Sequence, residues 1–205
     1  MKLYLVRHAI TTWNEKNRIQ GSKNPDLSLT GWKQAKRLAR RLQKEDISLI
    51  YASDRLRSKR TAQAIQKALR VPLFYEKGLR EIHLGLWEGK TPDEVNRHYQ
   101  NGYWKWLQAP SSVRIPAAEP VKAFRKRVLQ TFDRLVQEAP EGNILIVTHG
   151  GVIATFLSSV LKGSEDYFLL RLRLDNAGIS VVRVKDRRKV VVSCINDTSH
   201  LRDLV

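Results

Sequence analysis

The sequence predicts an α/β fold, a three-layer sandwich in which a mostly parallel central sheet carries helices on both faces. Short apolar runs alternate with amphipathic stretches along most of the 205 residues, and this alternation is typical of such sheets. No internal repeat or low-complexity linker divides the chain. With 42% apolar and 28% charged residues, a chain of this length can bury a substantial core. We therefore expect a single domain over residues 1–205.

Short apolar runs predict the strands of this sheet. Each run is apolar, or alternates in polarity, and is bounded by polar residues, as strands are. Four runs are expected to form buried strands: residues 2–6, 48–53, 71–75 and 143–148. Three C-terminal runs alternate between apolar and polar residues, which favours antiparallel or edge strands: residues 169–176, 178–185 and 189–196.

Apolar residues at helical spacing predict the helices that cover the sheet. The expected helices are residues 30–44, 57–69 and 119–138, and a further helix that begins at Gly150. Trp32 is expected on the apolar face of the first helix, with Thr30 as its N-cap. The second helix is expected to be capped near Ser53 or Asp54.

An aromatic segment interrupts the alternation after a glycine-containing loop over residues 76–90. Residues 91–118 hold several prolines, glycines and aromatic side chains. We therefore expect a small helical excursion there instead of another strand–helix unit. Tyr103, Trp104 and Trp106 are expected to pack inside this excursion rather than to line an entrance for a ligand.

The chain carries a formal net charge of +17 and a single cysteine, Cys194. One cysteine excludes an intrachain disulfide framework and a metal site built on several thiolates. The N-terminus lacks the features of a signal peptide, and no run approaches the roughly 20 apolar residues of a membrane helix. We therefore expect a soluble cytoplasmic protein with no membrane partner. The charge predicts attraction to anions, although a basic solvated surface is the simpler interpretation.

Two histidines each terminate an apolar run that predicts a strand. His8 ends LYLVRH beside Arg7, and His149 ends ILIVTH before Gly150 and Gly151. Ligands of open α/β sheets bind outside the carboxyl ends of the strands, so the two histidines are expected to face one another across a crevice. The glycines leave room for a ligand close to backbone N–H groups at a helix start.

A metal site is the main chemical alternative at these histidines. It would require further His, Asp or Glu side chains at ligand spacing, such as an H-x-x-x-H pair on a helix. None of the five histidines offers that spacing. The sequence therefore predicts neither a metal nor a cofactor.

Six blocks of sequence occur in order from residue 3 to about residue 180: LVRHAITTWNEKNRIQG, PDLSLTGWKQA, SDRLRSKRTAQAI, LREIHLGLWEGKT, ILIVTHGGVI and LDNAGIS. In these blocks and their order the chain resembles the histidine phosphatase superfamily, which has the phosphoglycerate mutase-like fold. The resemblance implies a metal-independent phosphomonoester hydrolase that acts through a phosphohistidine. The block EIHLGLWEGKT is similar to the phosphatase branch, which includes broad-specificity and α-ribazole phosphatases.

The resemblance implies a role for each matching residue. His8 would be the nucleophile, and a neutral imidazole is a competent nucleophile at physiological pH. Arg7, Arg57 and a protonated His149 would stabilise the phosphoryl charge of a small phosphorylated substrate. Glu81 would be the general acid that protonates the leaving group and then activates water. Four further residues match positions that line the phosphate and substrate pocket, over which the excursion would lie: Asn14, Gln20, Gly21 and Gly150.

Two positions depart from the family pattern. Ala9 replaces the glycine that usually follows the catalytic histidine, and Pro120 replaces the serine expected after Glu119. Alanine tolerates neither a positive φ nor so close a backbone approach, so we expect a slightly reshaped pocket. Glu88, in contrast to Glu81, is expected to be a solvated loop carboxylate.

Three other functions are compatible with the sequence. The first is a phosphoglycerate mutase, although the mutases carry longer insertions over the pocket than 205 residues accommodate. The second is a catalytically silent relative, suggested by Ala9, which would bind phosphorylated partners without forming a phosphoenzyme. The third is a nucleic-acid-binding protein with basic helices at 30–44 and 122–127, although the chain has no aromatic RNA-binding motif and no zinc finger. The sequence defines neither the substrate nor the oligomeric state, and an oligomer is compatible with the terminal strands.

Overall fold

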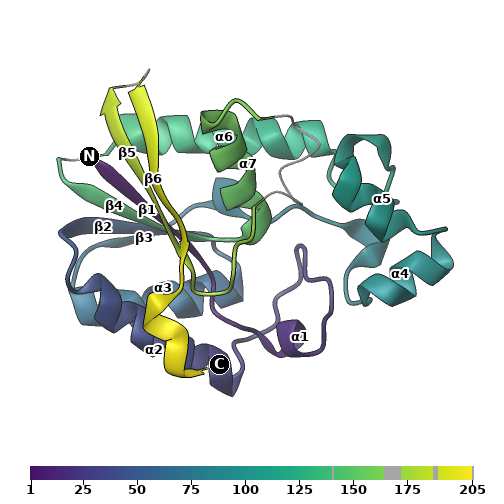
Figure 1. Ribbon diagram of the computed structural model, residues 1–205, viewed down its shortest axis with the longest axis horizontal. Coiled ribbons are helices and arrows are strands. Elements are labelled where there is room, and N and C mark those ends of the chain that lie inside the picture. Colours follow the sequence, from purple (N-terminus) through teal and green to yellow (C-terminus); the bar gives the residue numbers. More distant parts are fainter. Residues whose placement is uncertain (140, 164–171, 187–188, 205) are drawn as a thin grey trace.

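The computed structural model of the protein describes residues 1–139, 141–163, 172–186 and 189–204. Its centre is a six-stranded sheet with the order β3-β2-β4-β1-β5-β6 (Figure 1). The strands are β1 (Lys2–Arg7), β2 (Ile47–Ala52), β3 (Leu73–Tyr75), β4 (Asn143–Thr148), β5 (Ile179–Asp186) and β6 (Lys189–Asp197). The first four strands pair in parallel, whereas β5 is antiparallel to β1 and β6 to β5. The predicted fold class is confirmed.

Helices cover both faces of the sheet (Figure 1). α2 and α3 contact each other on one face, and α6 and α7 contact each other on the opposite face. The α-helices are α1 (Thr12–Glu15), α2 (Leu29–Leu42), α3 (Leu56–Leu69), α4 (Pro92–His98), α5 (Gly102–Gln108), α6 (Val121–Gln137) and α7 (Gly150–Val160). The 3₁₀-helices are η1 (Lys77–Leu79), η2 (Gly85–Trp87), η3 (Pro110–Ser112) and η4 (Ser199–Leu204). Within the described ranges, none of the helices combines the length and the apolar character needed to cross a membrane.

Two clusters of buried side chains fill the space between the sheet and its helices. Along β1, Leu3 and Leu5 join the cluster against α6 and α7, whereas Tyr4 and Val6 join the cluster against α2 and α3. This alternation is the two-residue period of a strand that is buried on both faces. Packing from both sides therefore fixes the end of β1, which carries His8.

The first long helix begins earlier than expected. Its N-cap is Ser28 and not Thr30. The Ser28 hydroxyl accepts a hydrogen bond from Gly31 N at 3.1 Å, which satisfies one of the free N–H groups of the first turn. Trp32 is 42% exposed, so the prediction that it joins the buried face of this helix is wrong.

The cap predicted for α3 near Ser53 or Asp54 is also wrong. The N-cap residue is Arg55, and its side chain makes no capping hydrogen bond. Ser53 Oγ lies 2.9 Å from His149 Nε2. Asp54 accepts two hydrogen bonds from Arg80, at 2.7 and 2.5 Å. Asp54 is therefore bound to another part of the protein, whereas Ser53 Oγ lies against His149 and also accepts from Arg55 N at 3.4 Å.

The C-terminal edge contains two of the three expected strands. β5 and β6 correspond to the runs predicted over 178–185 and 189–196. The run predicted over 169–176 is not a strand where it is described: residues 172–176 are irregular, and residues 169–171 lie outside the described residues. The carbonyl oxygen of Leu174 accepts a hydrogen bond from the side chain of Arg7, so it is engaged by the site and not by a neighbouring strand.

Candidate active site

β1 and β4 are neighbouring parallel strands, and each is followed by one of the two histidines. Arg7 pairs with Thr148 at the end of the register, and His8 N donates to Thr148 O at 2.9 Å. The ring centroids of His8 and His149 are 5.3 Å apart, with an interplanar angle of 62°. The topology therefore brings together, at the carboxyl edge of the sheet, two residues that about two thirds of the chain separates.

Arg57, from the first turn of α3, lies between the two histidines. Its Nε is 3.2 Å from His8 Nε2 and 3.2 Å from His149 Nδ1. Its Nη1 and Nη2 donate to the carbonyl oxygens of Lys23 and Gly21 at 2.7 and 2.8 Å. The side chain is 1% exposed, and this burial lowers the pKa of Arg57 to about 10, which leaves it charged at neutral pH. Arg57 is thus a fixed cation between two imidazoles.

Hydrogen-bond partners define the protonation of both imidazoles. His8 Nδ1 lies 2.8 Å from Ala9 O. Because a carbonyl oxygen only accepts, Nδ1 carries the hydrogen, and Nε2 keeps its lone pair. His149 Nδ1 accepts from Arg57. Burial, followed by the nearby charge of Arg57, lowers the pKa of both histidines well below the usual value of 6.5. Both rings are therefore neutral at pH 7, which corrects the expectation that His149 is protonated.

Stability is expected to fall as the pH drops below about 6.5, the pKa of an unperturbed histidine. The pKa of His8 and of His149 is lowered in the folded protein, so below this value the unfolded chain binds more protons than the folded one. Burial lowers the pKa of His200 in the same direction. The free energy of unfolding should therefore rise with pH through this window and then level off.

Urea unfolding measured from about pH 5 to pH 8 tests this expectation. Replacing the buried His149 by asparagine should flatten the dependence. Replacing His98, which is exposed, should leave it unchanged. A stability that does not vary over this range would contradict the prediction.

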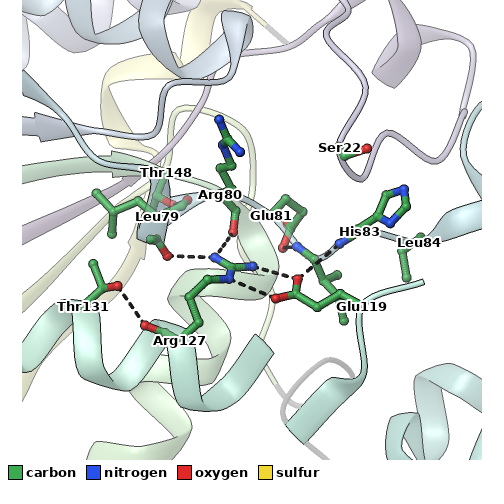
Figure 2. A network of polar contacts seen from close by, with 12 residues as sticks. Ser22, Leu79, Arg80, Glu81, His83, Leu84, Glu119, Arg127, Thr131 and Thr148 are labelled. Carbon is green, nitrogen blue, oxygen red and sulfur yellow. Dashed lines mark hydrogen bonds and ion pairs between the residues drawn. The ribbon is translucent and has the colours of Figure 1, made fainter. Parts of the chain in front are cut away.

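Glu81 reaches the same edge of the sheet from the segment between η1 and η2 (Figure 2). Its Oε2 accepts from Gly151 N, and its Oε1 from Ile82 N, both at 3.0 Å. A Cβ atom on Gly151 would lie 2.4 Å from Glu81 Oε1. Glycine at this position therefore allows the carboxylate to approach the first turn of α7.

Arg7 lies on the other side of the same helix start. Its Nη1 donates to Leu174 O at 2.5 Å, and a Cβ on Gly150 would lie 3.6 Å from its Nε. Burial lowers the pKa of Arg7, and the nearby Glu81 carboxylate opposes this effect. Among the described residues, no group of three or more His, Cys, Asp and Glu side chains is placed to hold a metal ion.

A cavity of about 410 Å³ opens where these groups meet. Its walls contain all but one of the residues predicted to form the site: Arg7, His8, Asn14, Gln20, Gly21, Arg57, Glu81 and Gly150. His149 is not in the walls. It is completely buried and reaches the cavity only through its contacts with His8 and Arg57.

The expectation that Glu88 is a solvated carboxylate is wrong. Its side chain is 1% exposed and accepts hydrogen bonds from Ser22 N, Ser22 Oγ and Leu84 N at 2.6, 2.8 and 3.0 Å. Gly21 has a φ of +47°, and a Cβ there would lie 2.1 Å from Glu88 Oε1. Glu88 therefore fixes the loop whose Gly21 carbonyl oxygen holds Arg57, and only glycine fits at this turn.

The departure at Ala9 does not disturb the backbone. Ala9 has no positive φ, it is fully buried, and its N–H donates to Thr61 Oγ1 at 3.1 Å. The conformation therefore does not require glycine, and the expected reshaping of the pocket has no basis in this backbone.

Several residues of the site were not identified from the sequence. Asn176 Nδ2 donates to His8 O at 2.9 Å, and Ser53 contacts His149. Tyr103 and Trp106, which were expected only to pack within the excursion, also line the cavity, whereas Trp104 is 53% exposed. Ser53 and Asn176 fall within two of the six blocks, but the position of a residue in a block does not reveal where its side chain points.

Two neutral imidazoles contact a buried guanidinium at the carboxyl edge of the sheet. This arrangement is typical of an enzyme that accepts a phosphoryl group on histidine. Comparison with known proteins is consistent with this class. The chain belongs to the histidine phosphatase superfamily, branch 1, whose family model matches residues 3–198. The resemblance seen in the six blocks is therefore confirmed.

Relatives named as phosphatases and relatives named as mutases have similar sequence identities to this chain. The chain is 32% identical over 201 residues to phosphoserine phosphatase 1 of Hydrogenobacter thermophilus, covering 98% of this chain and 94% of that protein. It is 33% identical over 183 residues to a protein of Serratia proteamaculans named a probable phosphoglycerate mutase, GpmB, covering 89% and 84%. The solved structure of Bacillus stearothermophilus YhfR matches with a TM-score of 0.91 at 30% identity and covers 98% of each chain.

Proposed function

We propose that the protein hydrolyses phosphomonoesters without a metal ion, through a phosphohistidine formed on His8. The observation that carries this proposal is the contact of His8 Nδ1 with Ala9 O at 2.8 Å, which assigns the ring hydrogen to Nδ1. The His8 Nδ1–H is bound to Ala9 O, so the Nε2 lone pair is directed towards Arg57 at the cavity wall. An imidazole held in this way is a competent nucleophile towards phosphorus.

In the first step, the lone pair of His8 Nε2 attacks phosphorus. A P–N bond forms, the P–O bond to the leaving group breaks, and its electron pair stays on the leaving oxygen. That oxygen takes the proton of the Glu81 carboxyl group, which leaves a carboxylate. Arg7 and Arg57 balance the charge of the other phosphoryl oxygens, because their guanidinium groups match phosphate oxygens in geometry and charge.

In the second step, water replaces the leaving group. Glu81 carboxylate takes a proton from the water, the water oxygen forms a P–O bond, and the P–N bond breaks. The electron pair of that bond returns to His8 Nε2, and inorganic phosphate leaves. The proton that Glu81 gave up in the first step is returned to it and His8 is again neutral, so the catalytic cycle closes.

Hydrolysis is favoured over phosphoglycerate isomerisation by the block around Glu81, EIHLGLWEGKT, which resembles the phosphatase branch of the family. The alignment with a phosphoserine phosphatase along nearly the whole chain is consistent with this choice. We further propose a small phosphorylated substrate and a cytoplasmic location, with no role for nucleic acid despite the positive charge.

Turnover of 4-nitrophenyl phosphate in EDTA, followed by mass spectrometry of the alkali-quenched enzyme, tests the proposal. We expect the same rate in EDTA as with added Mg²⁺, and a phosphoryl group on His8. The matched assay follows conversion of 3-phosphoglycerate into 2-phosphoglycerate. Loss of activity in EDTA, a phosphoenzyme at another residue, or isomerisation faster than hydrolysis would each overturn it.

A further inference from the structure

The main chain that carries Glu81 has no regular secondary structure of its own. Residues 80–84 lie between η1 and η2 and belong to no helix or strand. A general acid must lie within hydrogen-bond reach of the oxygen that it protonates. Contacts outside this segment must therefore determine where the Glu81 carboxyl group lies.

One side of the segment is held by Arg127 of α6 (Figure 2). Arg127 Nη1 donates to the carbonyl oxygens of Gly78 and Arg80, at 2.8 and 2.9 Å. The Arg80 carbonyl belongs to the peptide unit that immediately precedes the Cα atom of Glu81. On the same side, Thr148 Oγ1 donates to Leu79 O at 2.7 Å, so three successive carbonyl oxygens are fixed.

The other side of the segment is held by Glu119. Its N–H donates to His83 O at 2.9 Å, and its Oε2 lies 3.5 Å from His83 N. Glu119 is in turn bound in a bidentate pair to Arg127, through Oε1 to Nε at 2.9 Å and through Oε2 to Nη2 at 2.8 Å. The Arg127–Glu119 ion pair therefore contacts the main chain on both sides of Glu81, at Arg80 and at His83.

The ion pair is itself held in place and does not reach the substrate cavity. The Arg127 guanidinium lies over the ring of Phe124, 5.1 Å from its centroid. A Cβ atom on Gly78 would lie 2.0 Å from Thr131 Oγ1, one turn further along α6. The helix therefore contacts the segment directly. The side chains of Arg127 and Glu119 are 27% and 21% exposed, and neither residue lines the cavity that contains His8.

We propose that Arg127 and Glu119 are positioning residues, which set the Glu81 carboxyl group against the leaving oxygen. The inference rests on the proposed function, in which Glu81 protonates that oxygen. A guanidinium satisfies all of these contacts at once, because one planar fork reaches two carbonyl oxygens and both carboxylate oxygens together. Pro120, in the place of the expected serine, leaves the contacts of Glu119 intact.

The leaving group distinguishes positioning of an acid from a merely structural role. 4-Nitrophenol leaves readily without a proton, whereas unsubstituted phenol depends on the acid. Phenyl phosphate and 4-nitrophenyl phosphate have nearly the same shape, so both should enter the cavity alike. The quantity to compare is kcat/KM, because it reports on phosphoryl transfer even where the second step limits kcat. The ratio between two substrates measured on one preparation does not depend on the fraction of folded enzyme.

Arg127→Met should lower kcat/KM for phenyl phosphate about tenfold more than for 4-nitrophenyl phosphate. Arg127→Lys should shift the ratio of the two kcat/KM values less than Arg127→Met does, because lysine keeps a positively charged donor. The shift should not vanish, because lysine donates from only one point. Glu119→Gln, which keeps the size of the side chain, should change the ratio in the same direction. The matched control is Arg41→Met, which removes an arginine of similar exposure that pairs with Glu45 on the opposite face of the sheet; its ratio should equal that of the wild type.

Glu81→Gln is the reference for complete loss of the acid and separates the two proposals. If Glu81→Gln lowers both substrates equally, the acid role fails, and the positioning role fails with it. If Glu81→Gln is selective for phenyl phosphate but the Arg127 and Glu119 variants lower both substrates equally, or neither, only the positioning role is overturned. Selective loss in all of these variants, graded from lysine to methionine at position 127, supports it.

Discussion

Replacing His8 by alanine should reduce phosphatase turnover by at least about 10⁴-fold, the scale of losing a catalytic nucleophile. The loss follows from the geometry, because His8 lines the cavity and its Nε2, which accepts from Arg57, keeps the lone pair that attacks phosphorus. His149 cannot replace it, since its ring is completely buried, does not line the cavity, and has its Nε2 against Ser53. Steady-state hydrolysis of 4-nitrophenyl phosphate measures the effect.

His98→Ala is the matched control, because it removes an exposed histidine that does not line the cavity. It should leave turnover unchanged. The alanine variant at position 8 should also show no phosphoryl group on the alkali-quenched protein. Activity equal to that of the wild type would mean that His8 is not the nucleophile, and the proposed mechanism would fail with it.

Arg57→Lys should lower kcat/KM about 10²- to 10³-fold, the range expected when one fixed group that stabilises the transition state is removed. Arg57 Nε contacts both histidines, while its other two nitrogens bind the carbonyl oxygens of Gly21 and Lys23. A lysine ammonium is a single point of donation and cannot satisfy these acceptors together. The buried carbonyl oxygens left without a donor should also lower the free energy of unfolding by about 1–3 kcal/mol.

Kinetics and urea unfolding of the same preparation separate the two effects of Arg57→Lys. Arg60→Lys is the matched control on the same helix, because Arg60 is 43% exposed in its side chain and faces Asp26. It should change neither quantity measurably. A variant at position 57 that keeps wild-type kcat/KM would show that the bridge between the histidines does not contribute to catalysis.

The sequence allowed the strands and the ends of strands to be predicted well, because these features depend on local patterns. His8 and His149 each follow a continuous apolar run, and the rule that sites form at the carboxyl ends of strands then places them together. Arg57 was identified from its block, although three neighbouring cationic residues surround it in the sequence: Arg55, Lys59 and Arg60. In each of these cases the deciding information lies within a few residues.

Features that depend on partners far away in the chain could not be predicted. Glu81 and Glu88 lie in the same loop and have the same side chain, yet one lines the cavity and the other is buried against Ser22. Ser53 was expected to cap α3, but its closest side-chain partner is His149, at 2.9 Å, and it meets the helix start only at Arg55 N. Whether His149 is protonated depends on its burial and on Arg57, and neither is visible in the residues that flank it.

The strand order has a consequence for the way in which the protein folds. β4 lies between β2 and β1, so the last parallel strand to be synthesised occupies the gap between two of the first. Until β4 inserts, β1 and β2 have no common neighbour. Pairing β4 with β1 closes a loop that includes most of the chain, and the entropy cost of closing so long a loop slows this step. His8 meets His149 only when this insertion occurs. A chain synthesised only as far as residue 142 therefore lacks both the strand that joins β1 to β2 and the histidine that contacts His8.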